Sequence, residues 1–165
     1  MQKPAAILFD LDGTLVDSVF DLADALNRAL TDFGLPNRDI NQIRSWIGNG
    51  AKTLLIRAIS GKANPGTGTP AVHFLEFDDL YTAFKYYYSE RVYKSSQLYP
   101  GVLETLESLR SRDIKLAVVT NKPEVLAEKL LTEAGLRSFF GVVVGGDSLA
   151  VKKPDPAPLV YACAQ

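Results

Sequence analysis

The sequence predicts an α/β fold in which a parallel sheet forms a core and an all-helical domain is inserted into it. Short apolar runs rich in Val, Ile and Leu alternate with helical patterns in the second half of the chain. Such alternation is typical of βαβ units, which build parallel sheets. Between the first strand and this second half, residues 17–96 show only helical periodicity. We therefore expect one core interrupted by a helical insertion.

Three segments are predicted to be buried strands: 5–9 (AAILF), 115–120 (KLAVVT) and 141–146 (GVVVGG). Each is short and apolar almost throughout, with no alternation of polar and apolar residues. A strand that is buried on both faces has this pattern, because helices cover both sides of a parallel sheet.

Helices are predicted from apolar residues at i, i+3 and i+4 spacing. In the inserted region they span 18–33, 39–47, 51–59 and 76–93, and in the core they span 102–112, 124–134 and a final segment from Asp155 onward. Ser18 is the expected N-cap of the first helix, and Gly34 with Pro36 ends it. Gly48, Asn49 and Gly50 separate two helices. Residues 60–74 are rich in Gly, Pro and Thr, so we expect a loop there, with His73 in it.

Composition and charge limit the classes of function that we expect. Hydrophobic residues make up 47% and charged residues 22% of the 165 residues, as in ordinary globular proteins. The formal net charge of −1 predicts neither a nucleic-acid partner nor a polybasic membrane contact. Cys163 is the only cysteine, so no intrachain disulfide can form. The N-terminus lacks a secretory apolar core and no apolar run could span a bilayer, so we expect a cytoplasmic protein of undetermined oligomeric state.

Polar residues follow the predicted strands. Asp10 and Asp12 come directly after the first strand, Thr120 and Asn121 end the second, and Lys153 follows the third. The carboxyl ends of parallel strands meet at one edge of a sheet, where ligands bind. Crowded carboxylates repel each other unless a cation joins them, and Mg²⁺ binds through one or two carboxylates plus substrate phosphate. A Mg²⁺ and phosphate site is therefore expected at this edge.

The motifs FDLDGTLVDS (9–18), VVTNKP (118–123) and KKPDPAP (152–158) resemble, in this order, three signatures of the haloacid dehalogenase superfamily. The resemblance implies a Rossmann-like core over 1–16 and 97–165 and a helical cap domain over 17–96. Within the superfamily, RSWIGNGAKTLLIRA (44–58) and VVVGGDSLAVKKPDPAPL (142–159) are similar to stretches of bacterial phosphoglycolate phosphatases.

Residue roles follow from that resemblance. Asp10 would attack phosphorus as the nucleophile, and Asp12 would act as general acid and then as general base. Thr120 and the backbone N–H of Asn121 would hold the phosphoryl oxygens, and Lys153 would neutralise the phosphoryl group and Asp10. Mg²⁺ would be bound by the Asp10 carboxylate and the backbone carbonyl of Asp12. A neighbouring like charge would help Asp12 to hold the proton that its first task requires.

The implied activity is Mg²⁺-dependent hydrolysis of a small phosphate monoester through an aspartyl-phosphate, with 2-phosphoglycolate as the preferred substrate. Gly48, Asn49 and Gly50 would form a cap loop that closes over the substrate. Another sugar or nucleotide phosphate, or a phosphosugar mutase reaction, is the alternative within the superfamily. Phosphonate hydrolysis would need a cap lysine, for which Lys52 is the nearest candidate, but the surrounding GNGAK fits phosphoglycolate phosphatases better.

The resemblance is incomplete near the end of the sequence. The fourth signature of the superfamily is an acidic pair that completes the Mg²⁺ site, and no acidic pair follows Lys153. The only Gly-Asp, Gly146-Asp147, precedes that lysine. The sequence is thus expected to be the first two-thirds of a phosphatase, with its first strand left at a hydrophobic edge. A non-catalytic fragment that acts at most as a binding module is the alternative from a different functional class.

Overall fold

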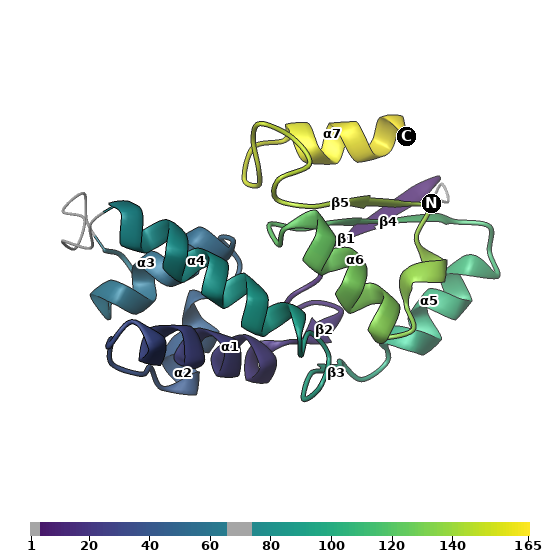
Figure 1. Ribbon diagram of the computed structural model, residues 1–165. Helices are drawn as coiled ribbons and strands as arrows, with labels where there is room; N and C mark the ends of the chain where they lie inside the picture. Colours follow the sequence, from purple (N-terminus) through teal and green to yellow (C-terminus); the bar gives the residue numbers. More distant parts are fainter. Residues whose placement is uncertain (1–3, 66–73) are drawn as a thin grey trace. The chain divides into compact units, whose positions relative to one another are not determined.

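The computed structural model describes residues 4–65 and 74–165, of which residues 74–76 are described by their backbone alone. The chain forms two compact units, one from residues 1–17 and 97–165 and the other from residues 18–96 (Figure 1). The first unit contains the sheet and the second is helical. No helix in the described ranges is both long enough and apolar enough to cross a bilayer.

The core unit is built on a three-stranded parallel sheet. Its strands are β1 (Ala6–Phe9), β4 (Lys115–Val119) and β5 (Val142–Val144), in the order β1-β4-β5. Its two strand pairings are both parallel, with Phe9 opposite Val118 and Val118 opposite Val143. The parallel α/β core expected from the apolar runs is confirmed, and every strand ends within two residues of its predicted position.

Helices cover both faces of this sheet, which explains why its strands are apolar almost throughout. Helices α5 (Val102–Arg110) and α6 (Glu124–Glu133) lie on one face, and α7 (Ala157–Ala164) lies on the other (Figure 1). A short 3₁₀ helix, η1 (Arg137–Phe139), follows α6. Leu130 and Leu131 of α6 and Val118 of β4 are fully buried. Among the described strands β1 pairs only with β4, so it forms an edge of the sheet, as expected.

Two very short strands were not predicted. Strand β2 (Val16–Asp17) pairs in antiparallel fashion with β3 (Gln97–Leu98). Each strand has only two residues, too few to show any periodicity, and their pairing depends on bringing together segments about eighty positions apart in the sequence. Asp17 therefore belongs to this small ladder, where it lies opposite Gln97.

The helical unit contains α1 (Val19–Asp32), α2 (Ile40–Trp46), α3 (Ala51–Ser60) and α4 (Phe74–Ser89). Helices α1 and α4 contact each other along their length. Their contact is filled by fully buried apolar side chains, among them Leu26, Leu30, Leu80, Phe84 and Tyr88. The aromatic stripe of α4 thus supplies core residues, with the rings of Phe84 and Tyr88 stacked at 6.0 Å between centroids.

Helix boundaries differ from the expected ones at several places. Helix α4 ends at Ser89 instead of Tyr93, because residues 90–94 form turns. Ser18 occupies the N-cap position of α1 but makes no capping hydrogen bond with its side chain. The predicted break at Gly48-Asn49-Gly50 is confirmed, whereas most of the predicted 60–74 loop, including His73, lies outside the described residues.

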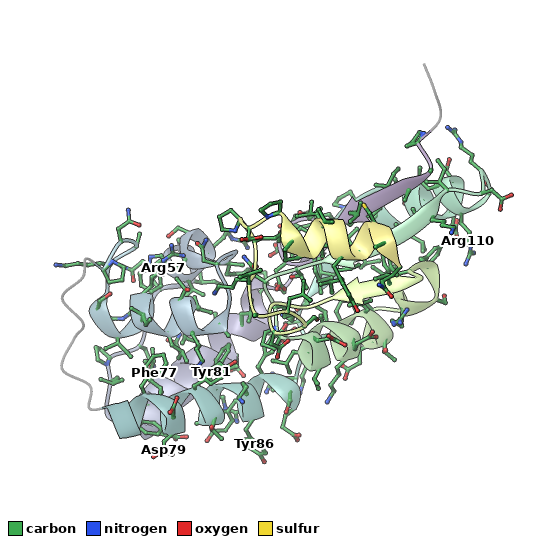
Figure 2. The ribbon with its side chains drawn as sticks, turned by 90° about the horizontal axis from the view of Figure 1, so that it is seen from above. Arg57, Phe77, Asp79, Tyr81, Tyr86 and Arg110 are labelled. Carbon is green, nitrogen blue, oxygen red and sulfur yellow. The ribbon has the colours of Figure 1, made fainter. Side chains whose placement is uncertain are left out.

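The outer and inner sides of α4 differ in chemistry. Asp79 and Tyr86 are exposed on its outer side, whereas Phe77 and Tyr81 are half-buried on the side toward α3 (Figure 2). The Lys52 ammonium of α3 lies 5.5 Å from the centre of the Tyr81 ring.

At the contact with α1, the Tyr87 hydroxyl donates a hydrogen bond of 2.5 Å to Asp32. This bond to a carboxylate raises the pKa of Tyr87 above its usual value.

Candidate active site

The first strand delivers two aspartates into a tight turn at its carboxyl end. Asp10 follows β1 directly, and the N–H groups of residues 14, 15 and 16 all donate to the carbonyl of Leu11, at 3.0–3.2 Å. Gly13 has φ of +83°, a conformation that side-chain-bearing residues avoid, and its N–H donates to the Val16 carbonyl. Leu11 is fully buried and fixes the turn in the core. The turn therefore holds both aspartates rigidly at the sheet edge.

Asp10 is held by a lysine and a backbone amide. The Lys153 ammonium lies 3.0 Å from Oδ1 of Asp10, and the Leu11 N–H donates to the same oxygen at 2.8 Å. The Lys153 ammonium also donates to the Val119 carbonyl at 2.7 Å, so it is anchored to the end of β4. Both contacts fix the direction in which the Asp10 carboxylate points.

Asp12 is held by a different lysine. The Lys122 ammonium donates to both carboxylate oxygens of Asp12, at 3.0 and 3.1 Å. The side chain of Lys122 is 4% exposed and that of Asp12 is 13% exposed. The two aspartates that follow β1 are thus each paired with one ammonium group, so their charges are balanced locally.

The end of β4 contributes a hydroxyl and an amide. Thr120 and Asn121 are both buried, and the Thr120 N–H extends the sheet by donating to the Val144 carbonyl at 2.9 Å. The Thr120 hydroxyl oxygen accepts a hydrogen bond from the Lys122 N–H at 3.2 Å, which leaves its O–H proton to donate elsewhere. The Asn121 side-chain amide donates to the Lys153 carbonyl at 3.1 Å and ties this strand end to the lysine loop.

The loops that follow β4 and β5 interlock. The Gly146 N–H donates to the Lys122 carbonyl at 2.7 Å, and the Glu124 N–H donates to Asp147 Oδ1 at 2.7 Å. In the same network, the Ser148 hydroxyl oxygen accepts a hydrogen bond of 2.7 Å from the Gly145 N–H, and the hydroxyl donates to the Glu124 carboxylate. Asp147 therefore accepts a hydrogen bond from the first turn of α6, and Gly146-Asp147 joins the two loops.

Gly146 is expected to tolerate no side chain. A Cβ atom at this position would lie 2.3 Å from the Asn121 carbonyl oxygen and 2.7 Å from its carbon, so the backbone of the β4 exit loop would have to move. Gly146→Ala should lower the free energy of unfolding by about 1–3 kcal/mol, the usual cost of overpacking, as measured by urea denaturation. Gly141→Ala is the matched control, because nothing lies within 4 Å of its Cβ position. Equal stability of the two variants would contradict the interlocking of these loops.

The oxygen atoms available at the site are of the type that binds Mg²⁺. The residues available after β1 are the Asp10 carboxylate and the backbone carbonyl and carboxylate of Asp12, all hard oxygen donors, and Mg²⁺ is commonly held by one or two carboxylates with water and substrate phosphate. In the described part of the chain, no group of three or more His, Cys, Asp or Glu side chains could form a metal cage. The donor set fits an ion that is held by carboxylate and carbonyl oxygens together with water and substrate phosphate.

The predicted cap residues Gly48, Asn49 and Gly50 lie in the helical unit, in the turn between α2 and α3. The turn is tied to α3, since the Arg57 guanidinium donates to the Asn49 side chain at 2.9 Å and to the Trp46 carbonyl at 2.7 Å. Arg57 also donates to the Ala63 carbonyl, and it thereby links this turn to the end of α3.

The structure brings Asp10, Asp12, Thr120, Asn121 and Lys153 to one edge of the sheet, as their positions after the strands predicted. Lys122 was not among the predicted site residues. The available signal was its position in the polar segment Thr120-Asn121-Lys122 at the end of a strand. Gly146 was missed too, because its importance depends on the approach of another loop.

Comparisons with known proteins identify the chain's relatives. The haloacid dehalogenase-like hydrolase family matches residues 7–165. A phosphoglycolate phosphatase from Colwellia psychrerythraea is 43% identical over 170 residues, which cover all of this chain and 72% of the relative. A phosphoglycolate phosphatase from Haemophilus influenzae is 43% identical over 157 residues, which cover 95% of this chain and 69% of the relative.

Solved structures show the same architecture. The crystal structure of a predicted phosphoglycolate phosphatase from Haemophilus somnus matches with a TM-score of 0.88 and 41% identity, over 99% of this chain and 72% of that one. A haloacid dehalogenase-like family protein from Streptococcus pneumoniae, at 24% identity, shares the fold with a TM-score of 0.76, over 98% of this chain and 69% of that one. On both its sequence and its fold, the chain belongs to the haloacid dehalogenase-like hydrolase family.

Proposed function

We propose that the chain carries the active site of a Mg²⁺-dependent phosphatase for small phosphate monoesters, with 2-phosphoglycolate as its substrate. The observation that carries the proposal is the pairing at the strand ends: two aspartates two positions apart, each held by its own lysine, beside a buried hydroxyl at the end of β4. This arrangement offers a nucleophile, an acid–base group and positive charge for a phosphoryl group within one loop cluster.

In the first step Asp10 attacks phosphorus. A bond forms between an Asp10 carboxylate oxygen and phosphorus, the bond from phosphorus to the leaving oxygen breaks, and Asp12 gives a proton to the departing alkoxide. The contacts of Lys153 and of the Leu11 N–H fall on Oδ1 of Asp10. Oδ2 is therefore the oxygen that we assign to the attack.

In the second step water cleaves the aspartyl-phosphate. Asp12, now ionised, takes a proton from the water as the new oxygen–phosphorus bond forms, and Asp10 leaves with its carboxylate restored. The Thr120 hydroxyl, the Asn121 N–H and the Lys153 ammonium would stabilise the negative charge on the phosphoryl oxygens in both steps. Their donors are fixed by the sheet and by the interlocked loops, so little reorganisation is needed during the reaction.

Hydrolases of this family generally use a divalent metal ion, and we propose Mg²⁺ here. The Asp10 carboxylate and the backbone carbonyl of Asp12 would hold it. When bound, the ion would screen the phosphate charge from the incoming carboxylate.

The choice of 2-phosphoglycolate as substrate is based on the chain's relatives. Phosphoglycolate phosphatases from several bacteria are 39–43% identical to this chain over 95% or more of its length. The turn at Gly48-Asn49-Gly50 is our candidate for the cap loop that recognises the substrate. The single cysteine fits a reducing cytoplasm, where we place the enzyme. Another sugar or nucleotide phosphate is the alternative substrate.

The substrate assignment is tested by phosphate release from 2-phosphoglycolate by the 165-residue chain in Mg²⁺, beside a sugar phosphate and a nucleoside monophosphate at equal concentration. We expect kcat/KM to be highest for 2-phosphoglycolate. A higher value for a sugar or nucleotide phosphate would replace the substrate and keep the chemistry. Folded chain that hydrolyses none of the three would favour the alternative of a non-catalytic fragment.

Removal of the metal should abolish turnover. With excess EDTA we expect phosphate release from 2-phosphoglycolate to fall to the background rate, because the phosphate charge is then no longer screened, and to return when Mg²⁺ is added in excess over the chelator. Circular dichroism before and after chelation is the control for loss of fold. Undiminished turnover in EDTA would contradict the metal requirement.

A further inference from the structure

We propose that Lys122 is a positioning residue that orients the Asp12 carboxylate for its acid–base work, an inference that rests on the proposed function. Lys122 comes from the loop after β4 and meets Asp12 across 110 positions of sequence. It donates to both carboxylate oxygens, at 3.0 and 3.1 Å. A carboxylate held through both oxygens by one ammonium cannot turn about its Cβ–Cγ bond without breaking a charge-assisted hydrogen bond.

Burial strengthens this hold. Lysine side chains are almost never fully buried unless they are paired, and Lys122 is 4% exposed while Asp12 is 13% exposed. Hydrogen bonds between polar groups that are largely removed from water are stronger than those at the surface and are screened little by salt. The pair therefore holds Asp12 in a defined place, in contrast to the surface pair of Lys129 with Glu133, where both side chains are 42% exposed.

The backbone of Lys122 is itself held at both its N–H and its carbonyl group. Its N–H donates to the Thr120 hydroxyl oxygen at 3.2 Å, and its carbonyl accepts from the Gly146 N–H at 2.7 Å. The Lys122 side chain therefore extends from a backbone that is fixed by the segments following β4 and β5. The same hydrogen bond also fixes the Thr120 hydroxyl. Thr120, which we assign to the phosphoryl oxygens, and Lys122, which orients Asp12, are thus held by one network.

The two lysines at the site have separate tasks. Lys153 contacts Asp10 and the Val119 carbonyl, whereas Lys122 contacts Asp12. Lys153 is therefore placed to act on the nucleophile and the phosphoryl group. Lys122 acts through Asp12, so its loss should affect only the steps in which Asp12 moves a proton.

That difference gives the test. General acid catalysis matters when the leaving oxygen needs a proton, as in 2-phosphoglycolate, and matters little for p-nitrophenyl phosphate, whose phenolate leaves unprotonated. For Lys122→Met, the rate of phosphoenzyme formation measured by rapid quench should fall about 10- to 100-fold with 2-phosphoglycolate and less than about threefold with p-nitrophenyl phosphate. KM should change less than about threefold for either substrate, since we assign the phosphoryl oxygens to Thr120, Asn121 and Lys153.

Three variants complete the experiment. Lys122→Arg keeps the charge and two donors, so it should restore most of the loss with 2-phosphoglycolate. In an Asp12→Asn background, Lys122→Met should cause no further loss, because the residue through which it acts is already disabled. Lys129→Met removes an exposed lysine and should leave all rates unchanged. If Lys122→Met does not fold, Lys122→Gln carries the same comparison between the two substrates.

Equal losses with the two substrates in an active enzyme, or a further loss in the Asp12→Asn background, would overturn the positioning role and leave the proposed function in place. Wild-type chain that forms no phosphoenzyme with either substrate would overturn the proposed function, and the positioning role with it.

Discussion

Asp10→Asn should lower kcat for phosphate release from 2-phosphoglycolate by about 10³-fold or more, in keeping with the loss of a covalent nucleophile. The amide that replaces the carboxylate is a far weaker nucleophile, while its shape and its hydrogen bond from the Leu11 N–H are retained. The substitution also removes the partner of Lys153 at 3.0 Å, but this pair is partly exposed, so we expect the fold to survive.

Asp79→Asn is the matched control for that variant. It makes the same chemical change at an exposed position on the outer side of α4 (Figure 2). Phosphate release and circular dichroism spectra should be indistinguishable from those of the wild-type chain. Turnover by Asp10→Asn within tenfold of wild type would show that another group attacks phosphorus.

Asp21→Ala should lower the free energy of unfolding by about 3–4 kcal/mol. Asp21 lies in the first turn of α1 and is 1% exposed. Its carboxylate accepts hydrogen bonds from the N–H groups of Ser95 and Ser96 and from the Ser96 hydroxyl, at 2.6–2.9 Å. Alanine would leave the two donors of buried Ser96 without this acceptor, and unmet buried donors cost more than the bonds themselves contribute.

Urea denaturation followed by circular dichroism measures this loss, with Asp24→Ala as the control on the same helix. The Asp24 side chain is 42% exposed and pairs with Arg28 and Arg91 at 3.8 and 3.5 Å, so its removal should cost less than about 1 kcal/mol. If Asp21→Ala were as stable as Asp24→Ala, the segment at Ser95 and Ser96 would have to be held by other contacts.

The parts of the fold that could be predicted are those with a local signature. The three parallel strands are continuous apolar runs, and α1 carries a regular apolar stripe, so each was found from its own residues. The β2–β3 ladder could not be predicted because it is created by the meeting of distant segments. The end of α4 was placed too late because Val92 and Tyr93 continue the apolar spacing past Ser89 while the backbone turns.

The site, too, contains residues that could be predicted from the sequence and one that could not. Asp10, Asp12, Thr120 and Asn121 stand directly at strand ends, so topology alone brings them to one edge. The choice of Lys153 over its neighbour Lys152 came from the resemblance to the superfamily, and in the structure the Lys153 ammonium is the one at Asp10. Lys122 was missed because its partner is decided by the direction of a side chain in a folded loop, which no spacing in the sequence encodes.

The most direct test of the account is to identify the residue that becomes phosphorylated. The wild-type chain would be mixed with Mg²⁺ and 2-phosphoglycolate and quenched with borohydride, which reduces an aspartyl-phosphate to homoserine, and its peptides would be sequenced by mass spectrometry. We expect homoserine at position 10, only when substrate is present, and none in Asp10→Asn. Phosphate release without modification of Asp10, or homoserine at another aspartate, would contradict the assignment of Asp10 as the nucleophile.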